Sequence, residues 1–317
     1  MFKKLMASFG VGAAKVNLVL DKEGYRIGEV VSGKVIVMGG NAAQDINTLH
    51  VDVMMRVIIK GKEVKRVLDT VSVARNIRVE AREVKEIPFE HLLPLYYPIA
   101  KSSLSYFLIT KMDIAQAVDT DDNDPLLVLP NKDMQMVFDA LQILNFKEKI
   151  GSGKITESGQ EFEFYPGPQF AEQLKEIRLK FYVGQNEFKL LMEIEMNGGY
   201  MRSGIGHHAE LTVPADVRTN GSAQQLADAV KSFLEKELVV ISVQGPKMAP
   251  SNHSNQQALR HGSGMGGVMG GMVAGMLGGA LLGSILEGEE EANYVVGEED
   301  SFDTGLGDFL DFGDDDF

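Results

Sequence analysis

The chain has 317 residues, of which 44% are hydrophobic, which is enough for one large domain or two ordinary ones. It has no cysteine, which excludes disulfides, thiolate zinc sites and cysteine nucleophiles, and which fits a reducing compartment. The formal net charge is −14, but residues 287–317 alone carry 13 acids and no Lys or Arg. Such a block repels nucleic acid and attracts basic patches, so we expect protein partners and no nucleic acid.

Alternating apolar residues predict a long β-hairpin in the first half of the chain. Every odd position from Leu49 to Ile59 is apolar, and the odd pattern resumes from Val67 to Val79. A period of two indicates strands with one buried face, and the sequence Lys-Gly-Lys at 60–62 is typical of a tight turn. Shorter strands are predicted over residues 15–20, 33–38, 84–89 and 104–114, with a loop over 21–29.

A second hairpin is predicted over residues 174–183 and 188–196, with its turn at 184–186. Shorter strands are expected at 161–164 and 209–213. Many strands without long intervening helices favour antiparallel sandwiches over a parallel α/β sheet.

Two helices are nevertheless predicted. Apolar residues recur at helical spacing from Met134 to Leu144, and Asn131 is placed to cap that helix. Ser222 is placed to cap a second helix that runs to Leu238. The first of them begins where the first sandwich should end, at about residue 130.

Composition then divides the chain into five predicted parts. We expect sandwich domains over residues 1–129 and 130–243, the second with helices, and a linker over 244–264. An apolar segment patterned by glycine follows at 265–286, and an acidic aromatic tail, expected to be disordered, occupies 287–317.

Several stretches of the first 240 residues resemble SpoOM-type sporulation-control proteins. They are FKKLMASFGVGAAKVNLVL, YRIGEVVSGKVIVMGGNAAQDINTLHV, EVKEIPFEHLLP, TKMDIAQAVDTDDNDPLLVLP and QEFEFYPGPQFAEQLKEIRLKFYV. The resemblance implies a mainly β protein with two arrestin-like antiparallel β-sandwich domains, a few short helices and a disordered C-terminal tail. It also implies a cytoplasmic, non-catalytic protein that acts through protein partners, and it fixes no ligand site on particular residues.

Polar clusters in the body of the chain point to no catalytic, cofactor-binding or metal-binding residue. Asp119, Asp121 and Asn123 have the first spacings of a calcium loop, but the sixth position is Asp124 and the twelfth is Pro130. We therefore interpret the acidic run that includes Asp113 and residues 119–124 as a solvated hinge. His207 and His208, as neighbours on a strand, should point to opposite faces and not share an ion, while Glu193 and Glu195 are expected on an exposed face.

The apolar segment at 265–286 repeats glycine every four residues. These glycines would line one side of a helix and allow another helix to approach closely; they are Gly267, Gly271, Gly275, Gly279 and Gly283. Three interpretations stay open: a membrane-spanning helix, an amphipathic helix for oligomerisation or membrane-surface contact, and a flexible apolar linker.

The end of the chain interleaves acids with aromatic rings and resembles the acidic tip of bacterial single-stranded-DNA-binding proteins, without the Ile-Pro that precedes the last Phe there. Its rings suit an apolar pocket rimmed by Lys and Arg, and its carboxylates suit the rim. The candidate partner-binding residues are Phe309, Leu310, Phe312, Asp314, Asp315, Asp316 and Phe317.

The leading functional hypothesis is a non-enzymatic regulatory adaptor or scaffold without cofactors, acting through protein–protein contacts. The alternative from another class is a membrane-associated structural protein that uses the segment at 265–286. The chain is thus expected in the cytoplasm, with peripheral contact to the inner membrane and homo-oligomerisation left open.

Overall fold

A computed structural model describes residues 13–59, 61–115, 120–156, 158–184, 187–197 and 206–245. The strands of the first half are β1 (Lys15–Leu20), β2 (Gly24–Arg26), β3 (Val30–Met38), β4 (Gln44–Ile59), β5 (Lys62–Val79), β6 (Val84–Leu92), β7 (Leu104–Ile114) and β8 (Thr120–Leu129). The strands of the second half are β9 (Lys147–Glu148), β10 (Lys154–Thr156), β11 (Gly159–Tyr165), β12 (Leu174–Val183), β13 (Phe188–Met196) and β14 (His207–Thr212). The helices are α2 (Lys132–Ile143), α3 (Ala215–Asn220) and α4 (Ala223–Gln244).

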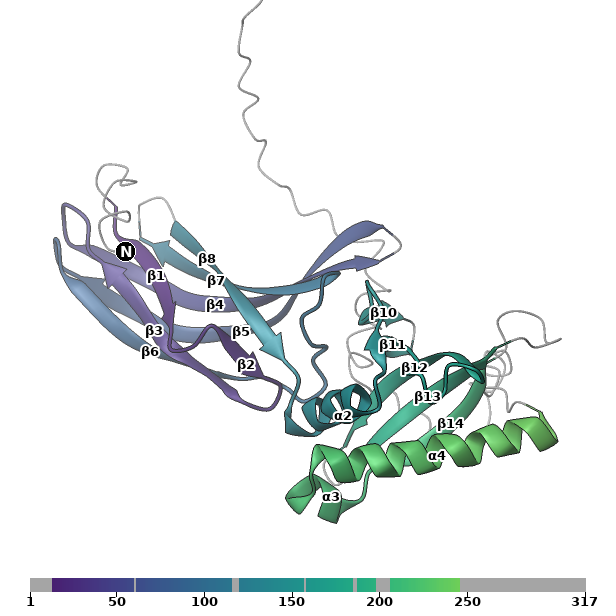
Figure 1. Cartoon of the computed structure of the whole chain (residues 1–317). Helices are drawn as coiled ribbons and strands as arrows, with labels where there is room; N and C mark the ends of the chain where they lie inside the picture. Colours follow the sequence, from purple (N-terminus) through teal and green to yellow (C-terminus); the bar gives the residue numbers. More distant parts are fainter. Residues whose placement is uncertain are drawn as a thin grey trace, which may run out of the picture.

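The first half is a sandwich of two sheets. A three-stranded sheet of order β1-β3-β6 faces a five-stranded sheet of order β2-β8-β7-β4-β5 (Figure 1). Neighbouring strands are antiparallel except β2, which runs parallel to β8. The sandwich core forms between the inner faces of the two sheets because every second side chain points inward.

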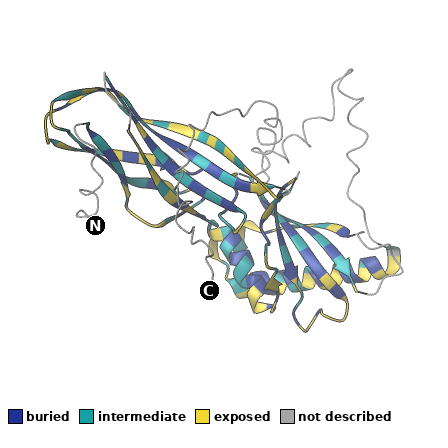
Figure 2. Cartoon of the chain, turned by 90° about the horizontal axis from the view of Figure 1, so that it is seen from above, coloured by how far each residue is buried: buried dark blue, intermediate teal, exposed yellow. Residues whose placement is uncertain are grey.

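The β4–β5 hairpin follows the predicted alternation. Leu49, Val51, Val53, Met55 and Val57 are fully buried, and the pairing closes at Ile59 and Lys62 around the predicted turn. Figure 2 shows the same alternation as buried and less buried bands along the long strands. The pairing register shifts once after Leu49 and once after Val53. These irregularities add local twist to the hairpin, and the apolar side chains stay in the core.

The second half is built from one sheet and two long helices. Strands β9 to β14 form a six-stranded antiparallel sheet, and α4 runs along it (Figure 1). The Phe138 ring on α2 lies 5.3 Å from Phe162 on β11 and 5.4 Å from Phe181 on β12, between ring centroids. Helix α4 buries an apolar stripe at helical spacing, made of Leu226, Ala227, Val230, Leu234, Leu238 and Ile241.

The predicted fold class, mainly β with few helices, is therefore confirmed. The second half differs from the predicted pair of facing sheets, because it has a single sheet. Its apolar sheet face is covered by helices, since a helix of 22 residues is about 33 Å long and spans several strands. Both predicted caps are present. Asn131 accepts a hydrogen bond from the Met134 amide, and Ser222 with Gln225 forms a capping box.

Two predictions of irregular structure in the first half are wrong. The expected loop over residues 21–29 contains strand β2. Of the expected acidic hinge, Asp113 lies on β7 and residues 120–124 lie on β8. Strands β2 and β8 are defined by distant partners, because among the described strands β2 pairs with β8 alone, and β8 pairs along most of β7. Long-range pairing here overrides the low strand propensity of Asp, Asn and Gly.

Candidate protein-interaction surface

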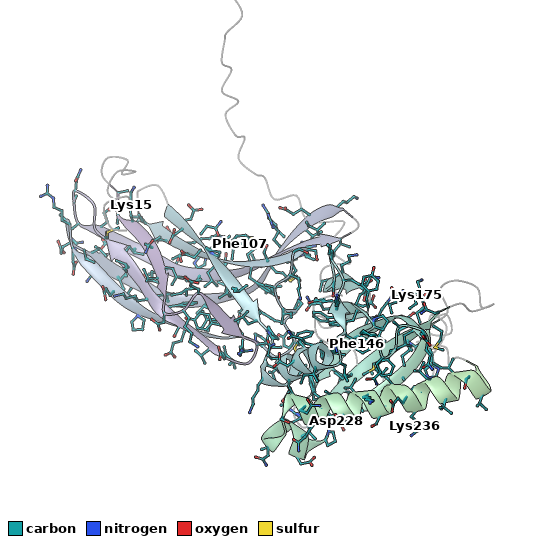
Figure 3. The ribbon with its side chains drawn as sticks, in the orientation of Figure 1. Lys15, Phe107, Phe146, Lys175, Asp228 and Lys236 are labelled. Carbon is teal, nitrogen blue, oxygen red and sulfur yellow. The ribbon has the colours of Figure 1, made fainter. Side chains whose placement is uncertain are left out.

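One row of mostly apolar side chains crosses the outer face of the five-stranded sheet. Val67 on β5 pairs with Met54 on β4, Met54 pairs with Phe107 on β7, and Phe107 pairs with Pro125 on β8. Directly paired residues point to the same face of a sheet, so these four side chains are neighbours. Val67 is 47% exposed, and Met54 and Phe107 are half-buried. Figure 3 labels Phe107 among the strands of the first half.

Cations flank this row at the hairpin end. The Arg56 guanidinium lies 5.9 Å from the centre of the Phe107 ring, and Arg56 pairs across the hairpin with Lys65. Both cations approach the same carboxylate, Glu63, at 3.5 Å and 3.4 Å. One carboxylate cannot neutralise two cations, so a positive charge remains beside exposed apolar surface.

The same strand is the outer edge of its sheet. Within the described residues β5 pairs with β4 and with no other strand. Lys62 and Arg75 lie exposed on β5, and their side chains make no ion pair or hydrogen bond to any other described residue. An edge strand with unpaired backbone groups can accept an added strand, and edge cations favour a partner with negative charge.

We define the hairpin surface as the region that combines these features. It contains the apolar row at its accessible end and the flanking cations on the same face. It also contains the exposed cation Lys62 at the end of the β5 edge, which pairs with Ile59 and therefore projects from the other face of the hairpin. Its residues are Met54, Arg56, Lys62, Lys65, Val67 and Phe107.

A buried histidine closes the seam between the two sheets beside β5. His91 on β6 is almost fully buried, and its Nδ1 lies 3.6 Å from a carboxylate oxygen of Asp69 on β5. Burial lowers the pKa of His91 and the Asp69 charge opposes that shift only in part, so the imidazole is neutral at physiological pH. Its Nε2 is buried without a hydrogen-bond partner among the described residues.

The opposite edge of the sandwich is closed by side chains, in contrast to β5. The backbone amide of Leu18 on β1 donates to Asp122 Oδ2 at 2.9 Å, and the Ala14 amide donates to the Gln44 side chain at 2.6 Å. These bonds occupy edge amides that would otherwise be available to a partner. The β5 edge is therefore the better candidate for strand addition.

The acidic run predicted as a hinge faces both sides of strand β8. Asp121 and Asn123 are exposed, whereas Asp122 and Asp124 are less exposed and lie on the inner side. Burial and then the charge of Asp122 raise the pKa of Asp124 to about 7. Asp119 lies outside the described residues, and no three His, Asp or Glu side chains in the described part of the chain are grouped to hold a metal ion.

The histidine pair of β14 lies on opposite faces, as predicted. His207 is buried, with its Nε2 2.7 Å from Glu237 on α4, and His208 is exposed. The prediction that Glu193 and Glu195 lie on an exposed face is wrong, because both side chains are mostly buried. Both are largely covered because Arg178 contacts both carboxylates on that face, at 2.9 Å and 3.2 Å.

The remaining predicted site residues lie outside the described residues. These are the glycines of the segment at 265–286 and the tail residues from Phe309 to Phe317. Their roles in oligomerisation, membrane contact and partner binding stay predictions. No helix in the described ranges combines the length and apolar run that a bilayer crossing requires.

Sequence reasoning did not single out the hairpin surface. The strands of the hairpin are predictable from the alternation, and Lys62 and Lys65 lie close to the predicted turn. Neither the alternation nor these cations shows that β5 is an edge strand. The pairing of Met54 with Phe107 joins residues far apart in the chain. Only the register of three strands places the apolar row beside those cations.

Comparison with known proteins agrees with this architecture. A family model described as SpoOM protein matches residues 2–198. The sporulation-control protein spo0M of Bacillus subtilis (strain 168) is 31% identical over 215 residues, covering 63% of this chain and 83% of that protein. The crystal structure of Spo0M from Bacillus subtilis matches with a TM-score of 0.57 at 23% identity, covering 71% of this chain and 99% of that one. The chain belongs to the SpoOM protein family.

Proposed function

We propose that this chain is a non-enzymatic regulatory protein that binds other proteins through the hairpin surface. The regulatory role is supported by the family and by the name of the Bacillus subtilis relative, a sporulation-control protein. The binding mode is supported by one observation, the exposed edge strand β5 with cations beside an apolar row. A partner that fits offers an extended segment with acidic and aromatic side chains.

The chemistry of such a contact follows from the residues. Backbone groups of β5 would pair with the partner strand, while Val67 and Phe107 would meet its apolar side chains. Arg56, Lys62 and Lys65 would meet its carboxylates, which adds specificity and speeds association. Binding should weaken as salt is raised, because the cations are exposed and screened.

The test is quantitative affinity purification from cells, followed by binding measurements with the purified partner. The edge variant Lys62→Glu/Lys65→Glu reverses two exposed cations of the hairpin surface. The control variant Lys132→Glu/Lys236→Glu makes the same charge change on α2 and α4, also at exposed positions.

We expect the edge variant to lose the partner by about tenfold or more in affinity and the control to keep it, because like charges then face the partner's acids. Equal recovery by the two variants would reject the hairpin surface as the docking site. Thermal unfolding of both variants checks that the fold is intact.

A further inference from the structure

We infer that the hairpin surface is a docking site for the acidic, aromatic end of this same chain, residues 309–317. The contact is intramolecular and competes with partners of similar chemistry. That the tail competes with partners rests on the proposed function, whereas the contact between the tail and the hairpin surface does not.

Charge complementarity within the chain is the first argument. Residues 287–317 carry 13 acids and no base, whereas the body is nearly balanced. Within that balanced body, β5 carries five cations against two acids; the cations are Lys62, Lys65, Arg66, Arg75 and Arg78. Lys62 and Arg75 reach no described acid, so the strand keeps positive charge. An acidic segment held near it by the chain is attracted over about one Debye length.

Apolar complementarity is the second argument. The tail places Phe309, Phe312 and Phe317 among its acids, a composition that solvation alone does not require. The hairpin surface offers Val67 at 47% exposure, Ile58 nearby at 44% exposure, and the half-buried Phe107 under Arg56. Aromatic rings that cover such surface gain apolar burial and cation–π contact, while adjacent Asp side chains meet the lysines.

Tethering is the third argument for an intramolecular contact. Residues 246–286 separate the last described residue, Gly245, from the acidic block. A segment of that length spans up to about 135 Å when fully extended, so the connection does not prevent the tail from reaching β5. Covalent linkage also gives the tail an effective concentration of about a millimolar, which favours it over a second copy in dilute solution.

Carbodiimide cross-linking of the full chain tests the contact. The reagent joins a carboxylate to an amine only where the two are close. The acids of the tail at 314–316 should link to Lys62 and Lys65 about tenfold more than to Lys132 and Lys236, which are also exposed. High salt should abolish the difference, since exposed charges are screened.

Two variants test the two sides of the contact, the hairpin surface and the tail, while keeping the reacting groups. Arg56→Glu/Val67→Ser leaves both lysines, and Phe309→Ser/Phe312→Ser/Phe317→Ser leaves all carboxylates. Each should reduce the links to the hairpin surface several-fold, because apolar burial and cation attraction act together there. Lys236→Glu is the control and should leave them unchanged.

The results that would overturn the inference are distinct. Links spread evenly over all exposed lysines mean that the tail has no preferred site. In an equal mixture of ordinary and heavy-nitrogen protein, links between the two isotopic forms mean that a second copy, not the same chain, supplies the tail. Links that survive loss of the three rings reject the apolar part of the contact.

The partner experiment separates this inference from the proposed function. Neutralising Asp314, Asp315 and Asp316 as Asn should increase partner recovery by releasing the hairpin surface. If partner recovery depends on β5 but cross-links are absent, the proposed function stands and tail docking fails. If cross-links are present but β5 variants bind partners normally, tail docking stands and the proposed function fails.

Discussion

The carboxamide of Gln160 on β11 holds both backbone groups of Ile99. Its Oε1 accepts from the Ile99 amide and its Nε2 donates to the Ile99 carbonyl, each at 2.9 Å. The same Nε2 donates to the Gly153 carbonyl at 2.9 Å, and Gln160 is fully buried. A single side chain thus joins the segment between β6 and β7 to the sheet of the second half.

Replacing Gln160 by Leu should destabilise the protein by about 2–4 kcal/mol, since the backbone groups of Ile99 and Gly153 would be left buried without partners. Urea unfolding measures the loss. Gln224→Leu is the control, because Gln224 is exposed on α4 and its side chain, within the described ranges, bonds to the nearby Asp228 alone; its effect should stay within about 0.5 kcal/mol. Similar stabilities of the two variants would contradict the structural importance of this contact.

Sequence reasoning was most successful where structure is decided locally. The alternation from Leu49 to Val79 predicted the hairpin, and the caps at Asn131 and Ser222 predicted both helix starts. Such signals act over a few residues, because side-chain period and capping bonds depend on neighbours in the chain.

The features that were missed depend on distant partners. Strand β2 exists through its pairing with β8, and Gln160 looks like an ordinary polar residue until Ile99 lies beside it. The hairpin surface was only half predictable for the same reason. Its strands follow from alternation, but its edge position and the neighbour Phe107 follow from sheet order.

Asp124 should make stability depend on pH between about 4 and 7. Burial and Asp122 raise the pKa of Asp124 to about 7 from an ordinary value of 3.8, so the folded state holds a proton that the unfolded state releases. This contribution is present at low pH and is lost as pH rises toward 7. Asp124→Asn should therefore be more stable than the parent at pH 8 by about 1 kcal/mol, allowing for solvent screening of a half-buried group.

Chemical unfolding at pH 5 and pH 8 checks this expectation. The matched control is Asp121→Asn on the exposed side of the same strand. The idea fails if Asp124→Asn and Asp121→Asn change with pH in the same way.

Glu176 should behave in the opposite sense. Burial raises the pKa of Glu176, but hydrogen bonds from Lys149 at 2.7 Å and Arg178 at 2.5 Å outweigh burial and lower it overall. Its contribution is present above the ordinary pKa of 4.5 and is lost as pH falls below it. Glu176→Gln should cost about 1–3 kcal/mol at pH 7, because it removes the charge that two cations share.

The difference between Glu176→Gln and the parent should shrink below pH 4, where the parent carboxylate is protonated as well. Glu86→Gln is a suitable control, since Glu86 pairs with Lys34 on the exposed face of β3 and β6; its cost should stay under about 1 kcal/mol. A constant difference across pH would show that charge is not the cause.

His91 should loosen the seam between β5 and β6 in acid. Burial lowers the pKa of His91 below the ordinary 6.5, so the unfolded state takes up a proton more readily than the folded state. Stability from this group is present above pH 6.5 and is lost as pH falls below it. His91→Phe should remove that loss. When the pH is lowered from 7.5 to 5.5, we expect the Tm of His91→Phe to fall by about 2–4 °C less than the Tm of the parent falls.

The location of the acid effect distinguishes His91 from other titrating groups. Amide exchange along β5 and β6 should accelerate in the parent at pH 5.5 beyond the intrinsic change of exchange rate with pH, and should not do so in His91→Phe. His208→Phe is the control, because His208 is exposed on β14 and far along the chain from this seam. Acceleration spread over both halves of the protein, or present equally in His91→Phe, would show that another group controls the response. Because β5 carries the hairpin surface, the expected result would also tie partner access to the protonation of one buried imidazole.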